Sequence, residues 1–192
     1  MTSVTIFGSG NMGQAIGEVL TAGGASVQHI DTSTPQPAAV SGDIVVLAVP
    51  YPALDQIAGQ YGDQLAGKTV VETTNPLDFD TFDSLVVPAG SSATAELAAA
   101  LPDSHVLKAF NTNFAATLAA KTVGQNATTV QIAGDDASAK HALASAVKVG
   151  GVDAIDVGAL SRARELEAMG FLQLTLAASE KIGWTGGFGV VR

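Results

Sequence analysis

The stretch Val4-Thr5-Ile6-Phe7-Gly8-Ser9-Gly10-Asn11-Met12-Gly13 decides how this chain folds. A mostly apolar run comes first, and three glycines follow in the spacing Gly8-x-Gly10-x-x-Gly13. In that spacing the first glycine permits a tight turn, the second lets a pyrophosphate approach the backbone, and the third lets a helix pack close to a strand. Residues 14–20 then repeat apolar side chains at helical spacing. The stretch predicts a strand, a turn and a helix that bind a dinucleotide; an ordinary strand-turn-helix corner is the alternative.

Phosphates would be held by the backbone at the start of this helix. The first N–H groups of a helix have no intrahelical acceptor, and the helix dipole makes that end attractive to anions. No charged side chain is needed for such a site. The candidate cofactor-binding residues of the turn are therefore Gly8, Ser9, Gly10, Asn11, Met12 and Gly13.

The composition limits the class of protein. A chain of 192 residues fits one domain of common size, and its formal net charge of −9 disfavours a nucleic-acid partner. The absence of cysteine excludes disulfides and thiolate metal sites. No apolar run approaches the roughly 20 residues that span a bilayer, and the sequence opens on a strand pattern instead of a signal peptide. We expect a cytoplasmic protein with no membrane partner and no metal.

The end of the second strand carries the residue that distinguishes between nucleotides. Residues 25–30 have the pattern of a strand, and Asp31 follows 18 positions after Gly13. A carboxylate near that offset accepts hydrogen bonds from the adenine-ribose hydroxyls of NAD and repels the additional phosphate of NADP. The hydroxyls of Thr32 and Ser33 could instead receive that phosphate if Asp31 turns away. A plain turn residue is the remaining interpretation of Asp31.

Later strand ends supply further candidate residues. Ligands of parallel α/β sheets bind beyond the carboxyl ends of the strands. The apolar run 43–49 ends at Val49 and Pro50, and a later strand leads to Asn75, which the following proline biases to an extended conformation. We expect these three residues to line the nicotinamide half of a cofactor site. The polar residues 111–113 are either turn formers or substrate contacts.

Strands and helices alternate almost throughout the chain. Pro35 and Pro37 stand where a longer unit would carry its second helix, so we expect that helix to be missing. The alternation is typical of an α/β fold, here a Rossmann-type, doubly wound, mostly parallel sheet with a C-terminal helical extension. We assign residues 1–160 to the dinucleotide-binding domain and 161–192 to a helix and tail of the same compact unit. Strands are predicted at 4–7, 25–30, 43–49, 68–72, 105–110, 128–133 and 154–157, and helices at 14–20, 54–58, 91–101, 137–149 and 162–177.

The C-terminal segment differs in character from the rest of the chain. Its helix is predicted to present an apolar stripe formed by Leu166, Met169, Leu172 or Gln173, and Leu176. Because this is more apolar surface than a monomer easily covers, we expect a homo-oligomer, a dimer being the simplest. The glycine-rich residues 184–189 are either a flexible tail, which we favour, or a flap over a ring-shaped ligand.

The order of several motifs resembles one family over nearly the whole chain. These motifs are the glycine turn, Ala48-Val49-Pro50, Thr74-Asn75-Pro76-Leu77, Lys108-Ala109-Phe110-Asn111-Thr112, Ala133-Gly134-Asp135-Asp136 and the run from Val157 to Glu167. Their order and spacing resemble the NADP oxidoreductases that exchange hydride with a deazaflavin, factor 420. The resemblance implies NADP as cofactor and a deazaflavin as co-substrate. The same domain also resembles the nucleotide-binding part of certain membrane ferric reductases.

The sequence departs from this family at the end of the second strand. The family tends to have a glycine, a hydroxyl residue and an arginine there, whereas this chain has Asp31, Thr32 and Ser33. The carboxylate favours NAD. The intact family motifs favour NADP, towards which we lean, and both nucleotides stay open.

The function expected is that of an enzyme, an oxidoreductase that binds NAD(P) and transfers hydride between the nicotinamide and a small-molecule redox co-substrate. That partner would be a deazaflavin, a flavin or a similar molecule. Cofactors carry such chemistry themselves, so no catalytic side chain is predicted. A non-catalytic NAD(P)-binding sensor or subunit is the alternative. A dehydrogenase of small alcohols would need a proton donor, and Lys108 is the only strand-end lysine near the expected cleft.

Overall fold

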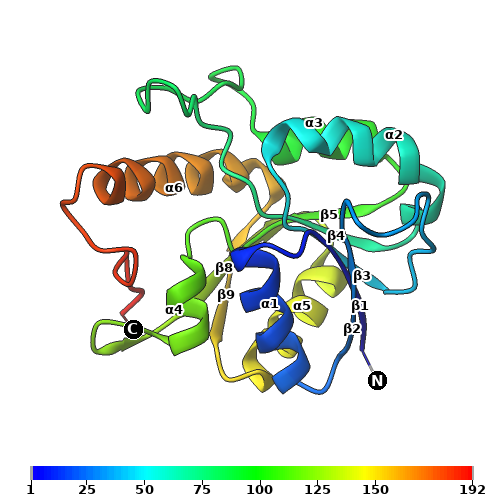
Figure 1. Ribbon diagram of the computed structural model, residues 1–192, viewed down its shortest axis with the longest axis horizontal. Coiled ribbons are helices and arrows are strands. Elements are labelled where there is room, and N and C mark those ends of the chain that lie inside the picture. Colours follow the sequence, from blue (N-terminus) through cyan, green and yellow to red (C-terminus); the bar gives the residue numbers. More distant parts are fainter. Residues whose placement is uncertain (1, 192) are drawn as a thin grey trace.

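The computed structural model describes residues 2–191, and seven of its strands form one sheet (Figure 1). The strands are β1 (Ser3–Phe7), β2 (Ser26–Ile30), β3 (Ile44–Leu47), β4 (Thr69–Glu72), β5 (His105–Lys108), β8 (Thr129–Gly134) and β9 (Asp153–Gly158). Their order is β2-β1-β3-β4-β5-β8-β9, and all neighbours are parallel except β5 and β8. The predicted Rossmann-type, mostly parallel sheet is therefore confirmed.

Helices cover both faces of this sheet. One face carries α1 (Asn11–Ala22) and α5 (Ala137–Val149), and the other carries α2 (Leu54–Leu65) and α3 (Ala93–Ala100). A final helix, α6 (Ala163–Ala178), packs beside α3 and β8. Two short 3-10 turns, η1 (Tyr51–Ala53) and η2 (Leu160–Arg162), precede α2 and α6. Within the described residues, no helix is long and apolar enough to cross a membrane.

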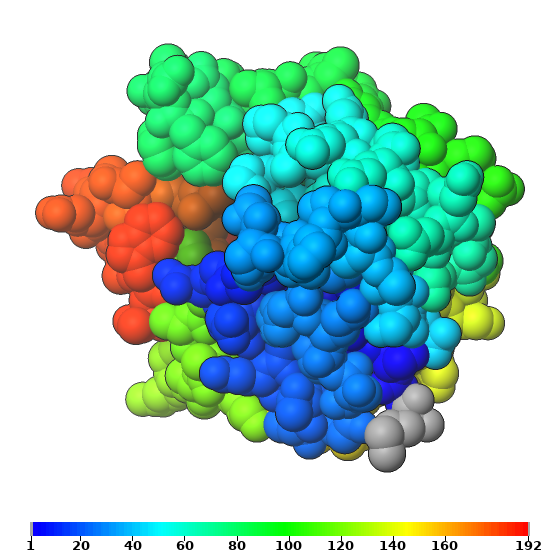
Figure 2. Space-filling view, turned by 45° about the vertical axis from the view of Figure 1, so that its right-hand side comes forward, coloured from blue at the N-terminus to red at the C-terminus, as the bar shows by residue number. Residues whose placement is uncertain are grey.

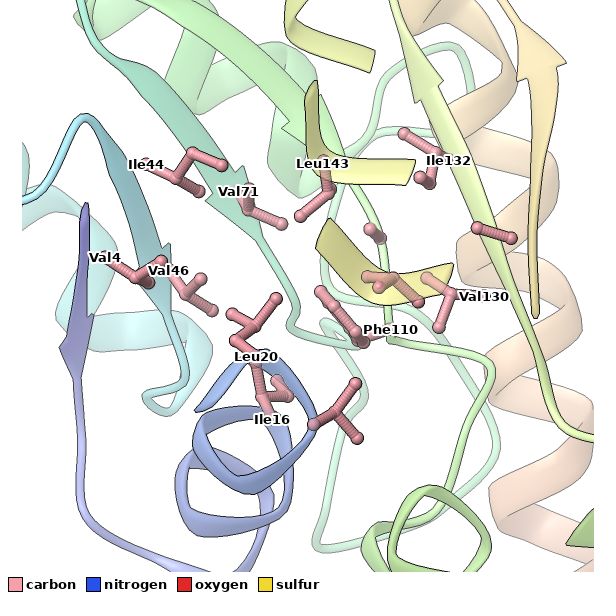
Figure 3. Close-up of a cluster of buried hydrophobic side chains, with 14 of the residues drawn as sticks. Val4, Ile16, Leu20, Ile44, Val46, Val71, Phe110, Val130, Ile132 and Leu143 are labelled. Atoms are coloured by element: carbon pink, nitrogen blue, oxygen red, sulfur yellow. The ribbon is translucent and has the colours of Figure 1, made fainter. Parts of the chain in front are cut away.

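Two hydrophobic cores result from the alternation of side chains along the strands. Successive residues of a strand point to opposite faces, so Val4 and Ile6 of β1 enter the core under α1 and α5, while Phe7 enters the core under α2 and α3. All four residues of β3 are buried, as expected of a strand covered on both faces. Figure 3 shows the first core, where Val4, Ile16, Leu20, Val46 and Phe110 lie close together.

The segment between β2 and β3 contains no helix, as the two prolines predicted. The Gln28 side chain holds this segment to the sheet edge instead. Its Oε1 accepts hydrogen bonds from Thr5 Oγ1 at 2.8 Å and Ser41 Oγ at 2.7 Å, and its Nε2 donates to the Ala39 carbonyl at 2.9 Å. The chain therefore passes from β2 to β3 without an intervening helix.

Several elements differ from the sequence predictions. The helix predicted at 54–58 extends to Leu65, and the strand predicted to reach 110 ends at Lys108, because Phe110 takes a left-handed conformation with φ of 66°. Besides the turns η1 and η2, three short elements were not predicted. They are α4 (Ala115–Ala120) and the hairpin of β6 (Thr122–Val123) with β7 (Asn126–Ala127). Elements of two to six residues are too short to show a hydrophobic period.

The buried face of α6 also differs from the predicted apolar stripe. Leu166 and Gln173 are buried and Leu172 is 52% exposed, so of the two residues left open the buried one is Gln173. The reason is that α6 packs on polar groups at the strand ends. Its buried residues are Ala163, Leu166, Glu167, Gly170, Gln173 and Ala177.

Candidate functional site

The glycine turn between β1 and α1 has the geometry that its sequence predicts. Gly8 has φ of 105°, a conformation that favours glycine, and a Cβ added there would overlap the Ala48 carbonyl oxygen. A Cβ added at Gly13 would overlap the Gly8 carbonyl oxygen. The N–H of Gly8 donates to the Ile30 carbonyl at 2.8 Å, which ties the turn to the end of β2. Two of the three glycines are therefore required by the fold itself.

Gly10 differs from the other two glycines. It has an ordinary extended conformation with φ of −73°, and a Cβ added there would meet no atom within 4 Å. Gly10 is also the N-cap residue of α1 and supplies no side chain to cap the first N–H groups of the helix. By contrast, Ser92 and Asp136 cap α3 and α5 with their side chains. Space and free donors at Gly10 are what a phosphate group needs.

A cavity of about 440 Å³ lies beside this turn. It brings together seven of the predicted site residues: Gly8, Ser9, Gly10, Asp31, Thr32, Val49 and Pro50. The other five predicted residues, Asn11, Met12, Gly13, Ser33 and Asn75, are not among those that line it. Its far wall comes from segments that the sequence did not point to, and the wall residues are Gln36, Ala53, Gln56, Ile57, Gln60 and Tyr61. The sequence signal for this wall was only the amphipathic pattern of α2.

The base of the far wall is partly aromatic. The Tyr61 ring stands edge-on to the Phe7 ring, with centroids 4.8 Å apart, and the Tyr61 hydroxyl donates to the Gln36 side-chain carbonyl. Ile57 and Ala53 add apolar surface, and the side-chain amides of Gln56 and Gln60 add hydrogen-bonding groups. An apolar slot with a few polar groups is suited to a planar heterocycle such as adenine.

Asp31 is the charged group of this cavity. Its Oδ1 accepts hydrogen bonds from the Ser33 N–H at 2.9 Å, the Ser33 hydroxyl at 2.6 Å and the Thr34 hydroxyl at 3.3 Å. Its Oδ2 accepts one from the Ser9 hydroxyl at 2.6 Å. These hydrogen bonds, that from the Ser33 hydroxyl first, hold the pKa of the Asp31 carboxyl well below its usual range.

Lys108 lies in a fully buried ion cluster at the ends of β4 and β5. Its Nζ is 2.5 Å from Glu72 Oε2, 2.6 Å from the Thr74 carbonyl oxygen and 2.9 Å from Glu167 Oε1. The Lys108 side chain has 0% exposure. Burial raises the pKa of the Glu167 carboxyl, against the opposing attraction of Lys108. Lys108 therefore joins α6 to the sheet, and its Nζ makes three hydrogen bonds within the cluster.

Asn75 takes part in a second polar contact under α6. Its Nδ2 donates to the Asn111 carbonyl at 2.8 Å, and the Asn111 Nδ2 donates both to Asn75 Oδ1 and to the Leu166 carbonyl, each at 2.8 Å. A Cβ added at Gly170 would overlap Asn75 Oδ1. Asn75 thus holds α6 against the strand ends, and its place at the nicotinamide end stays a prediction.

Tyr51 follows the predicted residues Val49 and Pro50 and is held by α3. Its hydroxyl donates to Glu96 Oε2 at 2.7 Å. Burial, together with the Glu96 carboxylate, raises the pKa of Tyr51 to about 12. This phenol therefore stays protonated at neutral pH and serves as a hydrogen-bond donor to α3.

The glycine-rich tail does not extend freely into solvent. Its Phe188 N–H donates to Gln173 Oε1 at 3.1 Å, and the Trp184 ring lies 5.0 Å from the Phe114 ring, centroid to centroid. In Figure 1 the tail returns from the end of α6 toward α4. Figure 2 shows a hollow between the orange-red C-terminal segment and the blue N-terminal segment, with green atoms at its base. The tail therefore makes contacts with α6 and with Phe114, and the choice between a flexible tail and a flap over a ligand stays a prediction.

Comparisons with known proteins agree with this geometry. The family profile described as "NADP oxidoreductase coenzyme F420-dependent" matches residues 27–76. An F420-dependent NADP reductase from Methanocaldococcus jannaschii is 30% identical over 152 residues, which cover 78% of this chain and 68% of that protein. The chain belongs to the coenzyme F420-dependent NADP oxidoreductases.

Three further proteins are similar to this oxidoreductase. The metalloreductase STEAP3 of Rattus norvegicus is 29% identical over 180 residues, 86% of this chain, but the chain spans only 36% of the rat protein. A solved structure from an Arthrobacter species, assigned to the F420-dependent NADP reductases, has a TM-score of 0.85 and 22% identity, with full coverage of both chains. A hypothetical protein from Sinorhizobium meliloti has a TM-score of 0.71 and 29% identity, covering 84% of this chain and 87% of its own.

Proposed function

We propose that this oxidoreductase transfers hydride between a nicotinamide dinucleotide and a second planar redox molecule. The observation that carries the proposal is the empty space at Gly10, where the start of α1 offers uncapped N–H groups beside a cavity of about 440 Å³. Gly8, Ser9, Asn11, Met12 and Gly13 complete the turn that would hold the pyrophosphate. Membership of an NADP-dependent family supports the same reading.

The protein's own residues would bind and orient the two rings. The far wall of the cavity, with Tyr61 and Ile57, would hold the adenine, and Val49 and Pro50 would direct the nicotinamide toward the strand ends. A bound nicotinamide supplies the hydride, so the chain needs no proton donor for that transfer. The tail at Trp184 would exclude water from the outer side of the hollow.

We propose a deazaflavin, a flavin or a similar flat molecule as the co-substrate. The support is the family description, which names coenzyme F420, and the hollow beside the N-terminal segment in Figure 2. A molecule of this class can stack on a nicotinamide and accept a hydride, which carries two electrons and one proton together. Residues 1–160 would bind the dinucleotide, and residues 161–192 would cover the co-substrate.

The experiment measures oxidation of NADPH and of NADH by the loss of nicotinamide absorbance. A deazaflavin, a flavin, a quinone and a ferric chelate with added flavin are offered in turn as acceptors. We expect turnover with at least one planar acceptor and none in Gly10→Val. Nucleotide binding without turnover across the panel would favour a non-catalytic sensor, and the absence of binding would overturn the proposal.

A further inference from the structure

We propose that the adenosine end of this cavity selects a dinucleotide with a free 2′-hydroxyl, NAD(H), and that Asp31 is the residue that determines this specificity. The inference rests on the proposed function, because it assumes that a nicotinamide dinucleotide binds beside the glycine turn. The nucleotide inferred here differs from the NADP that the family description names. The 2′-phosphate of NADP does not fit the groups that the structure places there.

The position of Asp31 supplies the first step. Asp31 follows the last residue of β2 and lines the cavity next to Ser9 and Gly10. Its carboxylate accepts four hydrogen bonds from neighbouring groups and donates none, so the side chain is held in its charged form. A phosphate monoester carries a charge of about −1.5 to −2 at neutral pH. A 2′-phosphate at this place would therefore meet a fixed negative charge.

The neighbouring donors supply the second step. Thr32 and Ser33 could bind a phosphate only if their donors were free. The Ser33 N–H and hydroxyl both donate to Asp31 Oδ1. The Gln36 side-chain amide donates to the carbonyls of Asp31 at 3.3 Å and Thr34 at 3.1 Å. The donors of Ser33 and Gln36 are thus already in use, and Thr32, which lines the cavity, offers only neutral donors that cannot balance the charge of a phosphate.

The absence of a cation is the third step. Among the residues that the structure describes as lining the cavity there is no lysine and no arginine. Arginine is the residue best suited to a phosphate because its planar group donates two parallel hydrogen bonds. The cavity therefore offers a 2′-phosphate no opposite charge, and the side-chain amides of Gln56 and Gln60 are neutral donors.

A ribose 2′-hydroxyl, unlike a 2′-phosphate, can form a hydrogen bond with the Asp31 carboxylate. A carboxylate oxygen has about two lone pairs, and the Ser9 hydroxyl uses only one on Asp31 Oδ2. The remaining lone pair can accept a hydrogen bond from a ribose hydroxyl, and a bond to an ionised acceptor is about twice as strong as a neutral one. Asp31 would therefore attract NAD(H) and repel NADP(H) with the same group.

The test compares dissociation constants for NADH and NADPH, measured by calorimetry, in the wild type and in Asp31→Asn and Asp31→Gly. We expect the wild type to bind NADH at least about tenfold more tightly, which corresponds to about 1.4 kcal/mol. Both variants should lose most of that preference, chiefly by binding NADPH more tightly. Asp43→Asn is the matched control, because it removes the same charge from an exposed residue that does not line the cavity. It should leave the preference unchanged.

Two further measurements separate the possible failures. The pair 5′-ADP and 2′,5′-ADP probes the adenosine end without a nicotinamide, and the wild type should prefer 5′-ADP. Higher salt concentration should narrow the preference, because it screens an exposed charge. Equal or tighter binding of NADPH and 2′,5′-ADP by the wild type would overturn the inference and leave the proposed function standing. If neither dinucleotide binds, the proposed function fails as well.

Discussion

Replacing Gly10 by valine should abolish nucleotide binding and leave the fold intact. An added side chain there meets no protein atom within 4 Å, and φ of −73° is open to any residue. Replacing glycine also stabilises by about 0.4–1 kcal/mol through the unfolded state, which offsets the poor N-cap quality of valine. We therefore expect the free energy of unfolding to change by less than about 1 kcal/mol. The same side chain fills the space where the pyrophosphate would lie.

Gly13→Ala is the contrasting variant. Its new Cβ would overlap the Gly8 carbonyl oxygen and lie 3.1 Å from the Gly8 carbonyl carbon, so α1 must move away from the turn. Overpacking of this kind costs about 1–3 kcal/mol. Gly13→Ala should therefore lose stability even without nucleotide, whereas Gly10→Val should not.

Thermal unfolding with and without nucleotide measures both effects. A ligand at about 100 times its dissociation constant stabilises the wild type by about 2.7 kcal/mol. For a chain of this size that corresponds to an increase of about 5–10 °C in Tm. Gly10→Val should unfold near the wild-type temperature and show no increase with nucleotide. An undiminished increase in Gly10→Val would refute the placement of the pyrophosphate at this turn.

Three other predictions concern α6. Lys108→Met should lower the free energy of unfolding, measured in urea, by about 3–5 kcal/mol, because it leaves the buried Glu72 and Glu167 carboxylates unpaired. The exposed control Lys148→Met should change that free energy by less than about 0.5 kcal/mol. An equal loss in both variants would contradict the role of the cluster. Because the pKa of Glu167 is raised, the folded state keeps a proton on this carboxyl that the unfolded state releases, so stability should fall as the pH rises from about 4.5 through the raised pKa. Denaturant titrations at several pH values measure this slope of stability against pH, and Glu167→Gln should flatten it. An unchanged slope in Glu167→Gln would assign the pH dependence to another group. The exposed Leu172 should contribute to self-association, so light scattering should report a dimer for the wild type and weaker dimerisation for Leu172→Glu. A monomeric wild type at micromolar concentration would disprove the dimer.

The main elements of the sheet could be predicted because their signals are local. The glycine spacing, the continuous apolar run of β3 and the prolines before it each act over a few residues, and each was confirmed. The N-terminal half of the candidate site was predictable for the same reason. Gly8 and Gly13 are needed by the turn, and Asp31 stands at the end of β2.

The other parts of the site depend on contacts between distant segments. Tyr61 reaches the cavity because α2 packs on the face of the sheet to which Phe7 of β1 points, which no local pattern reveals. Lys108 had the sequence position of a candidate proton donor, and only its contacts with Glu72 and Glu167 show that it is an internal ion pair. The choice between Leu172 and Gln173 on the buried side of α6 stayed open in the sequence because the packing partners of the helix are polar, and a hydrophobic pattern contains no information about such partners.

The polar contacts under α6 also fix the register of this helix. Apolar side chains can slide over one another at small cost, but hydrogen bonds depend on direction. A shift by one residue would turn the helix by about 100° and move it by about 1.5 Å. Such a shift would separate Glu167 from Lys108 and the Leu166 carbonyl from Asn111 at the same time. The chain that follows α6 consequently starts from one fixed place, from which the Trp184 ring reaches the Phe114 ring outside the helix.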